Sequence, residues 1–237
     1  PRAAHGHAGV ATGAGLAGQS VPMSVMRKKI AEHMINSRRT SAHVHSIFEI
    51  NFHEVDKIRQ AHKARYEAQG AKLTYLSFII KAAAEALRAV PVINASVSGD
   101  TIVYHQEINI GIAVALDWGL IVPVVKHADQ KSLFEISQSV VDLATRARAK
   151  QLKPDDVAGG TFTITNPGTF GATVGMPIIV SVGAIEKRVV VVDDAIAIRP
   201  MAFFSIGFDH RIIDGAVADE WLKHVKHTLE HWDPANV

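Results

Sequence analysis

The stretch FSIGFDHRIIDGAVADEW, residues 204–221, carries a strand-like apolar run directly into a group of charged side chains. Asp209, His210 and Arg211 end the run, and Asp214 comes just before a segment with the pattern of a helix. Charged side chains are seldom buried unless another group pairs with them. The stretch therefore predicts either a polar turn or a catalytic site at the end of a strand.

The composition of the 237 residues limits what the protein can do. A hydrophobic content of 48% is ample for a core, and 25 basic residues against 23 acidic ones indicate no basic face, which argues against nucleic acid as a partner. The sequence has no cysteine, which excludes disulfides, thiolate metal sites and a cysteine nucleophile. No apolar run reaches the roughly 20 residues of a membrane helix, so we expect no membrane partner.

Two regions differ in composition. Residues 1–20 are mostly Ala and Gly, which cannot bury enough surface to become ordered alone, so we expect a flexible linker there. Residues 21–237 have the patterns of a folded domain. The chain starts at Pro1 without a signal-peptide pattern, and this start is typical of a fragment boundary.

The folded region mixes hairpins with helices. Strands are predicted from β-branched or alternating residues in 45–52, in 101–125 with a tight turn at 117–119, in 159–166, and in a hairpin over 188–208 around Asp193 and Asp194. Helices are predicted from spacing and end signals after Ser24, with Met26, Ile30, Met34 and Arg38 on one face, and over 54–69, 74–90, 132–150 and 215–231. This order predicts an α/β fold in which helices cover a mixed sheet.

His210 is the first candidate for chemistry. A lone histidine is more often a core side chain hydrogen-bonded at a strand end, but a place between a strand and an Asp-Gly turn favours function. An imidazole with its ordinary pKa of about 6.5 accepts a proton from a thiol or hydroxyl at neutral pH. Because no serine or cysteine nucleophile motif lies nearby, a general base acting on a bound substrate fits better than covalent catalysis.

Four segments in one order carry a resemblance. DHRIIDGA holds H-x-x-x-D-G at His210, Asp214 and Gly215, and it follows PMSVMRKKIAEHM, INIGIAVALDWGLIVPVVKHAD and GGTFTITNPGTFG along the chain. These segments resemble the active-site motif, opening helix, central hairpin and oxyanion segment of the dihydrolipoamide acyltransferases, the core components of 2-oxo acid dehydrogenase complexes. The resemblance covers about residue 21 to the end. It implies a two-layer α/β sandwich like that of chloramphenicol acetyltransferase, and an acyltransferase catalytic domain over 21–237.

The resemblance also implies roles for single residues. His210 matches the general base, which takes the thiol proton of coenzyme A or dihydrolipoamide so that the thiolate attacks the other partner's thioester. Thr165 matches the hydroxyl that donates to the oxyanion, and its alternative is an ordinary strand residue. Asp214 matches an acidic residue that holds the His loop in shape by an ion pair with Arg27.

Other positions near the motif receive weaker assignments. Gly215 belongs to the motif and supports the site, and His43 lies in a region that resembles the family's substrate channel. Asp209 and Arg211 remain either site residues or solvated turn residues. His224, His227 and His231 share one face of the last helix, which we interpret as a solvated face with no metal role.

The implied substrates are coenzyme A and the dihydrolipoyl group carried on a partner lipoyl domain, with no metal. The implied assembly is a trimer in which His210 and Thr165 come from different chains, built into a 24-mer or 60-mer core through the C-terminal region. Decarboxylase and dihydrolipoamide dehydrogenase components would join through upstream domains. The expected location is the cytoplasm in a bacterium, or the mitochondrial matrix in a eukaryote.

Several alternatives stay open. Acetyl, succinyl and branched-chain acyltransferases share these motifs. An acetyl-coenzyme A-dependent O-acetyltransferase of the chloramphenicol acetyltransferase type shares the His motif, and a purely structural core would keep the histidine as a relic. After Ile179 the chain is several residues shorter than the family pattern, through either a true deletion or an omitted loop, so the contacts of that loop are also open.

Overall fold

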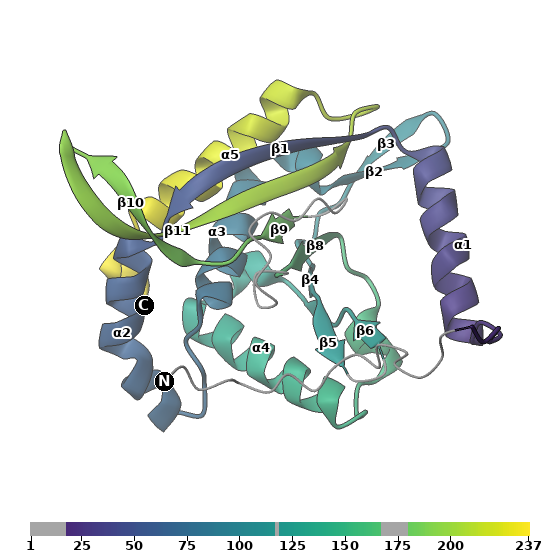
Figure 1. Ribbon diagram of the computed structural model, residues 1–237, viewed down its shortest axis with the longest axis horizontal. Helices are drawn as coiled ribbons and strands as arrows, with labels where there is room; N and C mark the ends of the chain where they lie inside the picture. The colour runs from purple at the N-terminus through teal and green to yellow at the C-terminus, as the bar shows by residue number, and fades with distance from the viewer. Residues whose placement is uncertain (1–17, 117–118, 167–179) are drawn as a thin grey trace.

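The computed structural model describes residues 18–116, 119–166 and 180–237 (Figure 1). The remaining positions include most of the predicted linker, Asp117 and Trp118 of the predicted turn, and the Pro167 and Gly168 that follow the short strand. The helices are α1 (Val25–Thr40), α2 (His53–Ala68), α3 (Tyr75–Ala89), η1 (Pro91–Asn94), η2 (Ala128–Gln130), α4 (Leu133–Arg148), η3 (Pro154–Val157), α5 (Gly215–Glu230) and η5 (Pro234–Asn236). The strands are β1 (His43–Asn51), β2 (Ala95–Ser98), β3 (Thr101–Tyr104), β4 (Ile110–Ile112), β5 (Val114–Leu116), β6 (Gly119–Ile121), β7 (Val124–Val125), β8 (Phe162–Thr165), β9 (Val180–Val182), β10 (Glu186–Val192) and β11 (Ala195–Asp209).

One mixed sheet organises the molecule. Its strands run in the order β1-β11-β9-β8-β4-β7, and β10 pairs with the first part of β11. β4, β8 and β9 are parallel, whereas β11 is antiparallel to both β9 and β1. The predicted α/β class with a mixed sheet is therefore confirmed, and β2–β3 and β5–β6 form two small hairpins beside the sheet.

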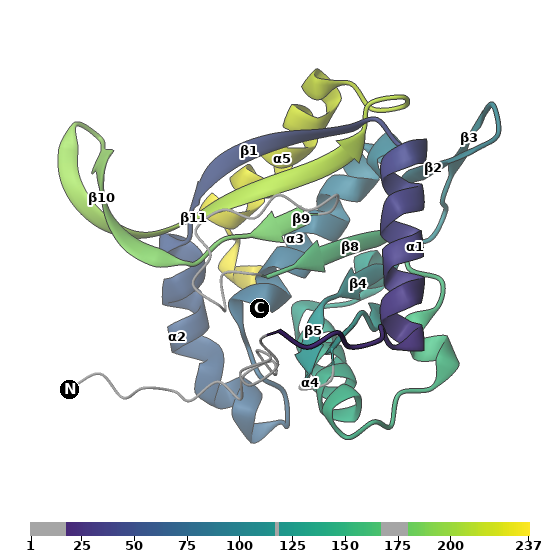
Figure 2. The same ribbon diagram turned by 45° about the vertical axis from the view of Figure 1, so that its right-hand side comes forward.

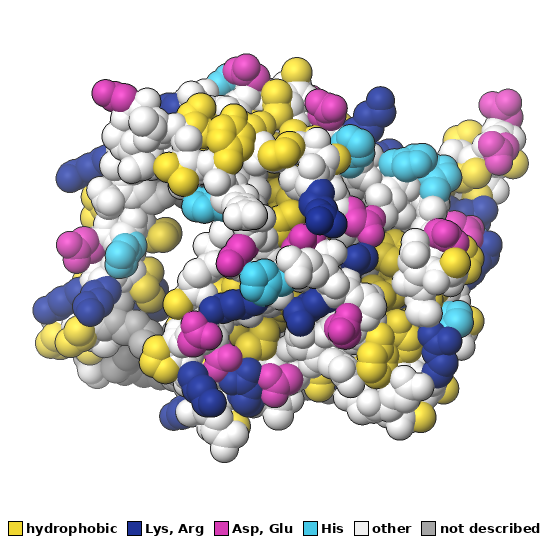
Figure 3. All heavy atoms as spheres, turned by 180° about the vertical axis from the view of Figure 1, so that it is seen from behind, with side chains coloured by type: hydrophobic (Ala, Val, Ile, Leu, Met, Phe, Trp, Pro, Cys, Tyr) yellow, Lys and Arg dark blue, Asp and Glu magenta, His cyan; other side chains and the backbone are white. Residues whose placement is uncertain are grey.

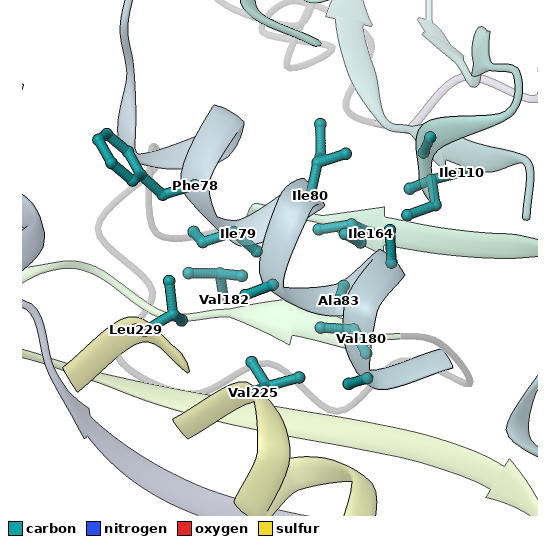
Figure 4. Packing of buried hydrophobic residues seen from close by; sticks show 14 of the residues in the cluster. Phe78, Ile79, Ile80, Ala83, Ile110, Ile164, Val180, Val182, Val225 and Leu229 are labelled. Atoms are coloured by element: carbon teal, nitrogen blue, oxygen red, sulfur yellow. The ribbon is translucent and has the colours of Figure 1, made fainter. Parts of the chain in front are cut away.

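Helices α3 and α5 cover one face of the sheet, and α3 is the more deeply buried (Figure 1). Between them and the strands, Ile79 and Ala83 of α3 meet Val182 of β9 and Val225 of α5 (Figure 4). From behind, the outer surface shows basic and acidic side chains interspersed, with no large area of one sign (Figure 3). The helical layer thus supplies both the core and a mixed-charge surface.

The β10–β11 hairpin projects from the sheet, as Figure 2 shows. Asp193 and Asp194 connect its strands with φ angles of 49° and 61°. A two-residue turn with positive φ at both positions matches the right-handed twist of the flanking strands, and Asp tolerates that conformation better than most residues. The hairpin predicted around these two residues is confirmed.

Helix α1 stands at the side of the body (Figure 1). Ser24 caps it, because its side chain accepts a hydrogen bond from the backbone N–H of Arg27 at 3.2 Å. The predicted helix is therefore confirmed, but Ile30 and Met34 of its apolar face are exposed in this single chain.

Core packing on β11 predicts a difference between neighbouring phenylalanines. Phe204 is fully buried with its ring 5.8 Å from that of Phe52, whereas Phe203 is half-buried under the Arg188 guanidinium. We expect Phe204→Ala to lower the free energy of unfolding by about 3–5 kcal/mol, because it leaves a cavity in the core. Phe203→Ala is the matched control and should cost clearly less. Urea unfolding at one protein concentration measures both, and equal losses would contradict this description of the core.

Candidate active site

Strand β11 carries the motif to the end of the sheet at which β1 begins. Its pairing with β1 continues to the last pair, His43 opposite Asp209, and beyond it the backbone N–H of His210 donates to the carbonyl of Ala42 at 2.8 Å. The chain then turns and enters α5 at Gly215. The backbone of His210 is therefore fixed by the residue that leads into β1.

Asp209 anchors this turn with both its side chain and its backbone. The carboxylate accepts hydrogen bonds from the backbone N–H of Ala42 at 3.2 Å and from the backbone N–H of Arg211 at 3.1 Å. The Arg211 guanidinium donates to the same carboxylate, with Nη2–Oδ2 at 2.6 Å. These bonds, led by those from the Arg211 side chain, hold the pKa of Asp209 far below its usual range. The sequence left Asp209 and Arg211 open, and the structure shows that they form an ion pair within the turn.

The imidazole of His210 is presented at the surface. Its side chain is 43% exposed, and its ring lies beside that of Phe208 with centroids 5.8 Å apart. Nδ1 lies 4.0 Å from Oδ1 of Asp214, whose side chain is 83% exposed. That distance is too long for a hydrogen bond, so the carboxylate faces the ring without bonding to it directly.

His43 lies directly across from Asp209 at the start of β1. Its Nε2 is buried and has no hydrogen-bond partner within the described part of the chain. The structure therefore places this predicted channel residue beside the turn that carries His210. Its role toward a substrate remains a prediction.

Thr165 lies far from His210 in the same chain. It ends β8 and pairs with Ser181 of β9, which in turn pairs with Ser205 of β11. His210 is five residues after Ser205 and directly follows the end of β11, so strand rise and strand spacing put Thr165 and His210 about 19 Å apart. A single chain thus does not bring the predicted base and the predicted oxyanion donor together.

Arg27 and Gly215 are the two residues that the resemblance assigns to the support of the site. Arg27 is in the first turn of α1, and its distance from Thr40 at the other end of this helix is about 20 Å along the axis. The Thr40 end adjoins the start of β1 (Figure 2), so Arg27 is remote from Asp214 within one chain. A Cβ at Gly215 would meet no described atom within 4 Å. An ion pair between Arg27 and Asp214 remains a prediction that requires two subunits.

A cavity of about 260 Å³ opens beside the turn. It lies between the last residues of β11, including Gly207 and Asp209, and the segment from Gly160 to Thr163 that leads into and forms β8, with Ile93 of η1 at one side. Its lining combines the apolar residues Ile206, Phe208 and Ile213 with the polar residues Thr161, Thr163 and Asp209. The cavity is therefore of mixed polarity, and it lies next to the segment that carries His210.

Potential metal-ligating side chains do not cluster among the described residues. No group of three or more His, Asp or Glu side chains in them is arranged to hold a metal ion. His227 and His231 stack on the exposed side of α5 with centroids 4.6 Å apart. In the same residues no helix has the length and hydropathy to cross a membrane.

Comparisons with known proteins agree with this arrangement. The fold is that of chloramphenicol acetyltransferase, to which the chain is similar with a TM-score of 0.53 at 12% identity over 87% of this chain and 98% of that one. A family model described as the 2-oxoacid dehydrogenases acyltransferase (catalytic domain) matches residues 16–237. The chain therefore belongs to this family of acyltransferase catalytic domains, which confirms the resemblance found in the sequence.

Relatives and solved structures cover most of the chain. The succinyltransferase component of the 2-oxoglutarate dehydrogenase complex of Cupriavidus necator is 41% identical over 92% of this chain, which spans about half (54%) of that relative. A probable dihydrolipoamide acetyltransferase from Listeria monocytogenes has a TM-score of 0.87 at 38% identity, covering 90% of this chain and 95% of the other. The cubic core of a pyruvate dehydrogenase complex and the Azotobacter vinelandii dihydrolipoamide acetyltransferase each give a TM-score of 0.85 at 32% identity, over 90% of this chain and 91% of the other.

The Asp209 anchor predicts a pH-dependent contribution to stability. Because the folded state lowers the pKa of this carboxyl, its stabilisation is present above the unfolded pKa of about 3.9 and is lost as the pH falls below it. We expect Asp209→Asn to lower the urea midpoint at pH 7, and the gap from the unmodified protein to narrow toward pH 3. Asp100→Asn, in an exposed turn, is the control. A gap that stays constant from pH 7 to 3 would contradict the role of this carboxylate.

Proposed function

We propose that this domain transfers an acyl group between the dihydrolipoyl group of a lipoyl domain and coenzyme A. His210 removes the proton from the attacking thiol, and the thiolate adds to the thioester carbonyl. The Thr165 hydroxyl of a neighbouring subunit donates a hydrogen bond to the oxyanion of the tetrahedral intermediate. When the intermediate collapses, the other sulfur leaves and takes the proton from the imidazolium of His210.

The observation that carries this proposal is the presentation of His210. The imidazole is half-exposed at the end of a core strand, its backbone is held by Ala42, and the chain belongs to the acyltransferase family. The alternative of a core histidine satisfied inside the fold is inconsistent with that exposure. An active base also argues against a purely structural core, although one domain can serve both roles.

The residues studied in the Azotobacter vinelandii enzyme support the assignment. The study of that structure addresses a serine, a histidine and an asparagine in the catalytic mechanism, with the asparagine four positions after the histidine. His210 and Asp214 have the same spacing here. The serine precedes the histidine by 52 positions there, and Thr165 precedes His210 by 45 here, which fits a chain that is shorter after Ile179.

Succinyl is the acyl group that we propose. The curated relatives from Cupriavidus necator and Pseudomonas aeruginosa, at 41% and 37% identity, are both named as succinyltransferase components of 2-oxoglutarate dehydrogenase complexes. The competing acyl group is acetyl, because the solved structures at 32–38% identity are named as acetyltransferases or belong to a pyruvate dehydrogenase complex.

The proposed active unit is a trimer. The separation of about 19 Å between Thr165 and His210 within one chain requires a second subunit to complete the site. The similarity to a cubic core supports further assembly of trimers into a 24-mer rather than a 60-mer. Lipoyl, decarboxylase and dihydrolipoamide dehydrogenase partners follow from membership of such a complex, and the bacterial relatives support a place in the bacterial cytoplasm.

A mixing experiment tests the shared site. Alone, His210→Ala should lower turnover by roughly 10²–10⁴-fold and Thr165→Ala by roughly 10²–10³-fold. When the two variants are co-expressed in equal amounts, about one site in four should recover. An intact site needs a Thr165→Ala subunit to supply His210 and a His210→Ala neighbour to supply Thr165, and each is present at its position in about half of the sites. Variants assembled separately and then mixed are the control. No recovery after co-expression would refute a site made by two subunits.

Initial rates with three donors test the acyl group. With dihydrolipoamide as acceptor, we expect succinyl-coenzyme A to give a kcat/KM at least about tenfold above those of acetyl- and isobutyryl-coenzyme A, which corresponds to about 1.4 kcal/mol of discrimination. A preference for acetyl-coenzyme A would overturn succinyl transfer but leave the site assignment intact. Transfer to chloramphenicol at a rate above that to dihydrolipoamide would instead favour the O-acetyltransferase.

A further inference from the structure

A second cavity lies apart from the turn that carries His210. It has a volume of about 360 Å³ and is formed where the end of α3, η1, the loop after β3 and η2 meet. Leu87 and Ile108 give it an apolar wall. Its polar side includes Arg88, Asn94 and Asp129. We call it the Asn94–Asp129 cavity.

Asn94 contributes an acceptor that the fold leaves unused. The residue is 2% exposed, and its Nδ2 donates to the carbonyls of His105 at 3.2 Å and Glu107 at 2.9 Å. Its Oδ1 is buried without a hydrogen-bond partner among the described residues. The buried Asn109 shows the usual outcome, because its Oδ1 accepts from the backbone N–H of His127 and its Nδ2 has two acceptors. A lone buried acceptor costs roughly 1–3 kcal/mol.

Asp129 contributes a second acceptor to the same cavity. Its side chain is only 8% exposed, and Oδ2 lies 3.5 Å from Nε of Arg88, whose side chain is 64% exposed. Oδ1 is buried and has no partner in the described part of the chain. The carboxylate is therefore paired on one side only, and by a long side chain that reaches it from the solvent side.

We propose that the Asn94–Asp129 cavity binds a small molecule that carries an ammonium group next to a carboxylate, as a free α-amino acid does. The ammonium donates to Oδ1 of Asn94 and to the carboxylate of Asp129, which supplies donors for both unused acceptors. Arg88, whose Nε lies 3.5 Å from Oδ2 of Asp129, moves outward as the ligand enters. Its guanidinium then pairs with the ligand carboxylate.

The dimensions of the cavity support an amino acid over a single water or a bare ion. One water occupies about 30 Å³ of liquid, so a space of about 360 Å³ holds far more than one. Leu87 and Ile108 offer an apolar wall for an aliphatic side chain. Arg88 and Asp129 place a positive and a negative charge side by side, so they can pair with the carboxylate and the ammonium of one α-amino acid.

Isothermal titration of the assembled protein with L-leucine tests this proposal. Two probes each lack one charged group: 4-methylpentanoate lacks the ammonium, and 3-methylbutan-1-amine lacks the carboxylate. We expect leucine to bind with a millimolar or tighter dissociation constant and each probe to bind at least about tenfold more weakly. Failure of leucine to bind at about 20 mM, or equal binding by either probe, would overturn the proposal.

Variants locate the binding to this cavity. Asp129→Asn and Arg88→Gln should each weaken leucine binding about tenfold or more. Asp155→Asn is the matched control, because Asp155 is exposed and pairs with Lys126 outside the cavity. If Asp129→Asn does not fold, as judged by circular dichroism, the exposed Arg88 still provides the test. Unchanged binding in Arg88→Gln would overturn the site, and no outcome depends on acyl transfer.

Discussion

The antiparallel setting of β11 against β9 is the constraint on which the active site depends. β8 and β9 run parallel, so Thr165 lies level with Ser205 of β11, while His210 lies beyond the end of that strand. No rotation of a side chain closes a separation of about 19 Å. In the proposed function, the sheet therefore keeps the base and the oxyanion donor apart within one subunit, and association of subunits becomes a condition of the chemistry.

The turn that carries His210 is stiffened from two directions. Ala42 donates to Asp209 and accepts from His210, so the lead-in to β1 holds both residues. The Arg211 guanidinium donates to the other oxygen of the Asp209 carboxylate. Because these bonds involve the backbone around His210, the imidazole can stay exposed to substrate without being loosely placed, and a general base depends on position before it depends on pKa.

Local sequence patterns predicted the helices, strands and turns well. Contacts between segments that are remote in sequence could not be predicted from them. The turn at Asp193 and Asp194 could be predicted because positive φ angles select few residue types. The bond between Asp209 and Ala42 could not be predicted, since Ala42 is remote in sequence and contributes only backbone atoms. The apolar face around Ile30 was predicted from spacing, but spacing does not say which chain covers that face.

The pairing of β1 with β11 also has a consequence during synthesis. Every register pair joins residues that are 150 to 166 positions apart, from Asn51 with Met201 to His43 with Asp209. At a translation rate of about 5–20 residues per second, β1 waits roughly 8 to 30 seconds on the ribosome for its only strand neighbour within the described sheet. Throughout that interval a strand with Phe48 and Ile50 lacks its partner. The nascent chain thus carries an aggregation-prone segment whose protection by chaperones would matter most before the last helix emerges.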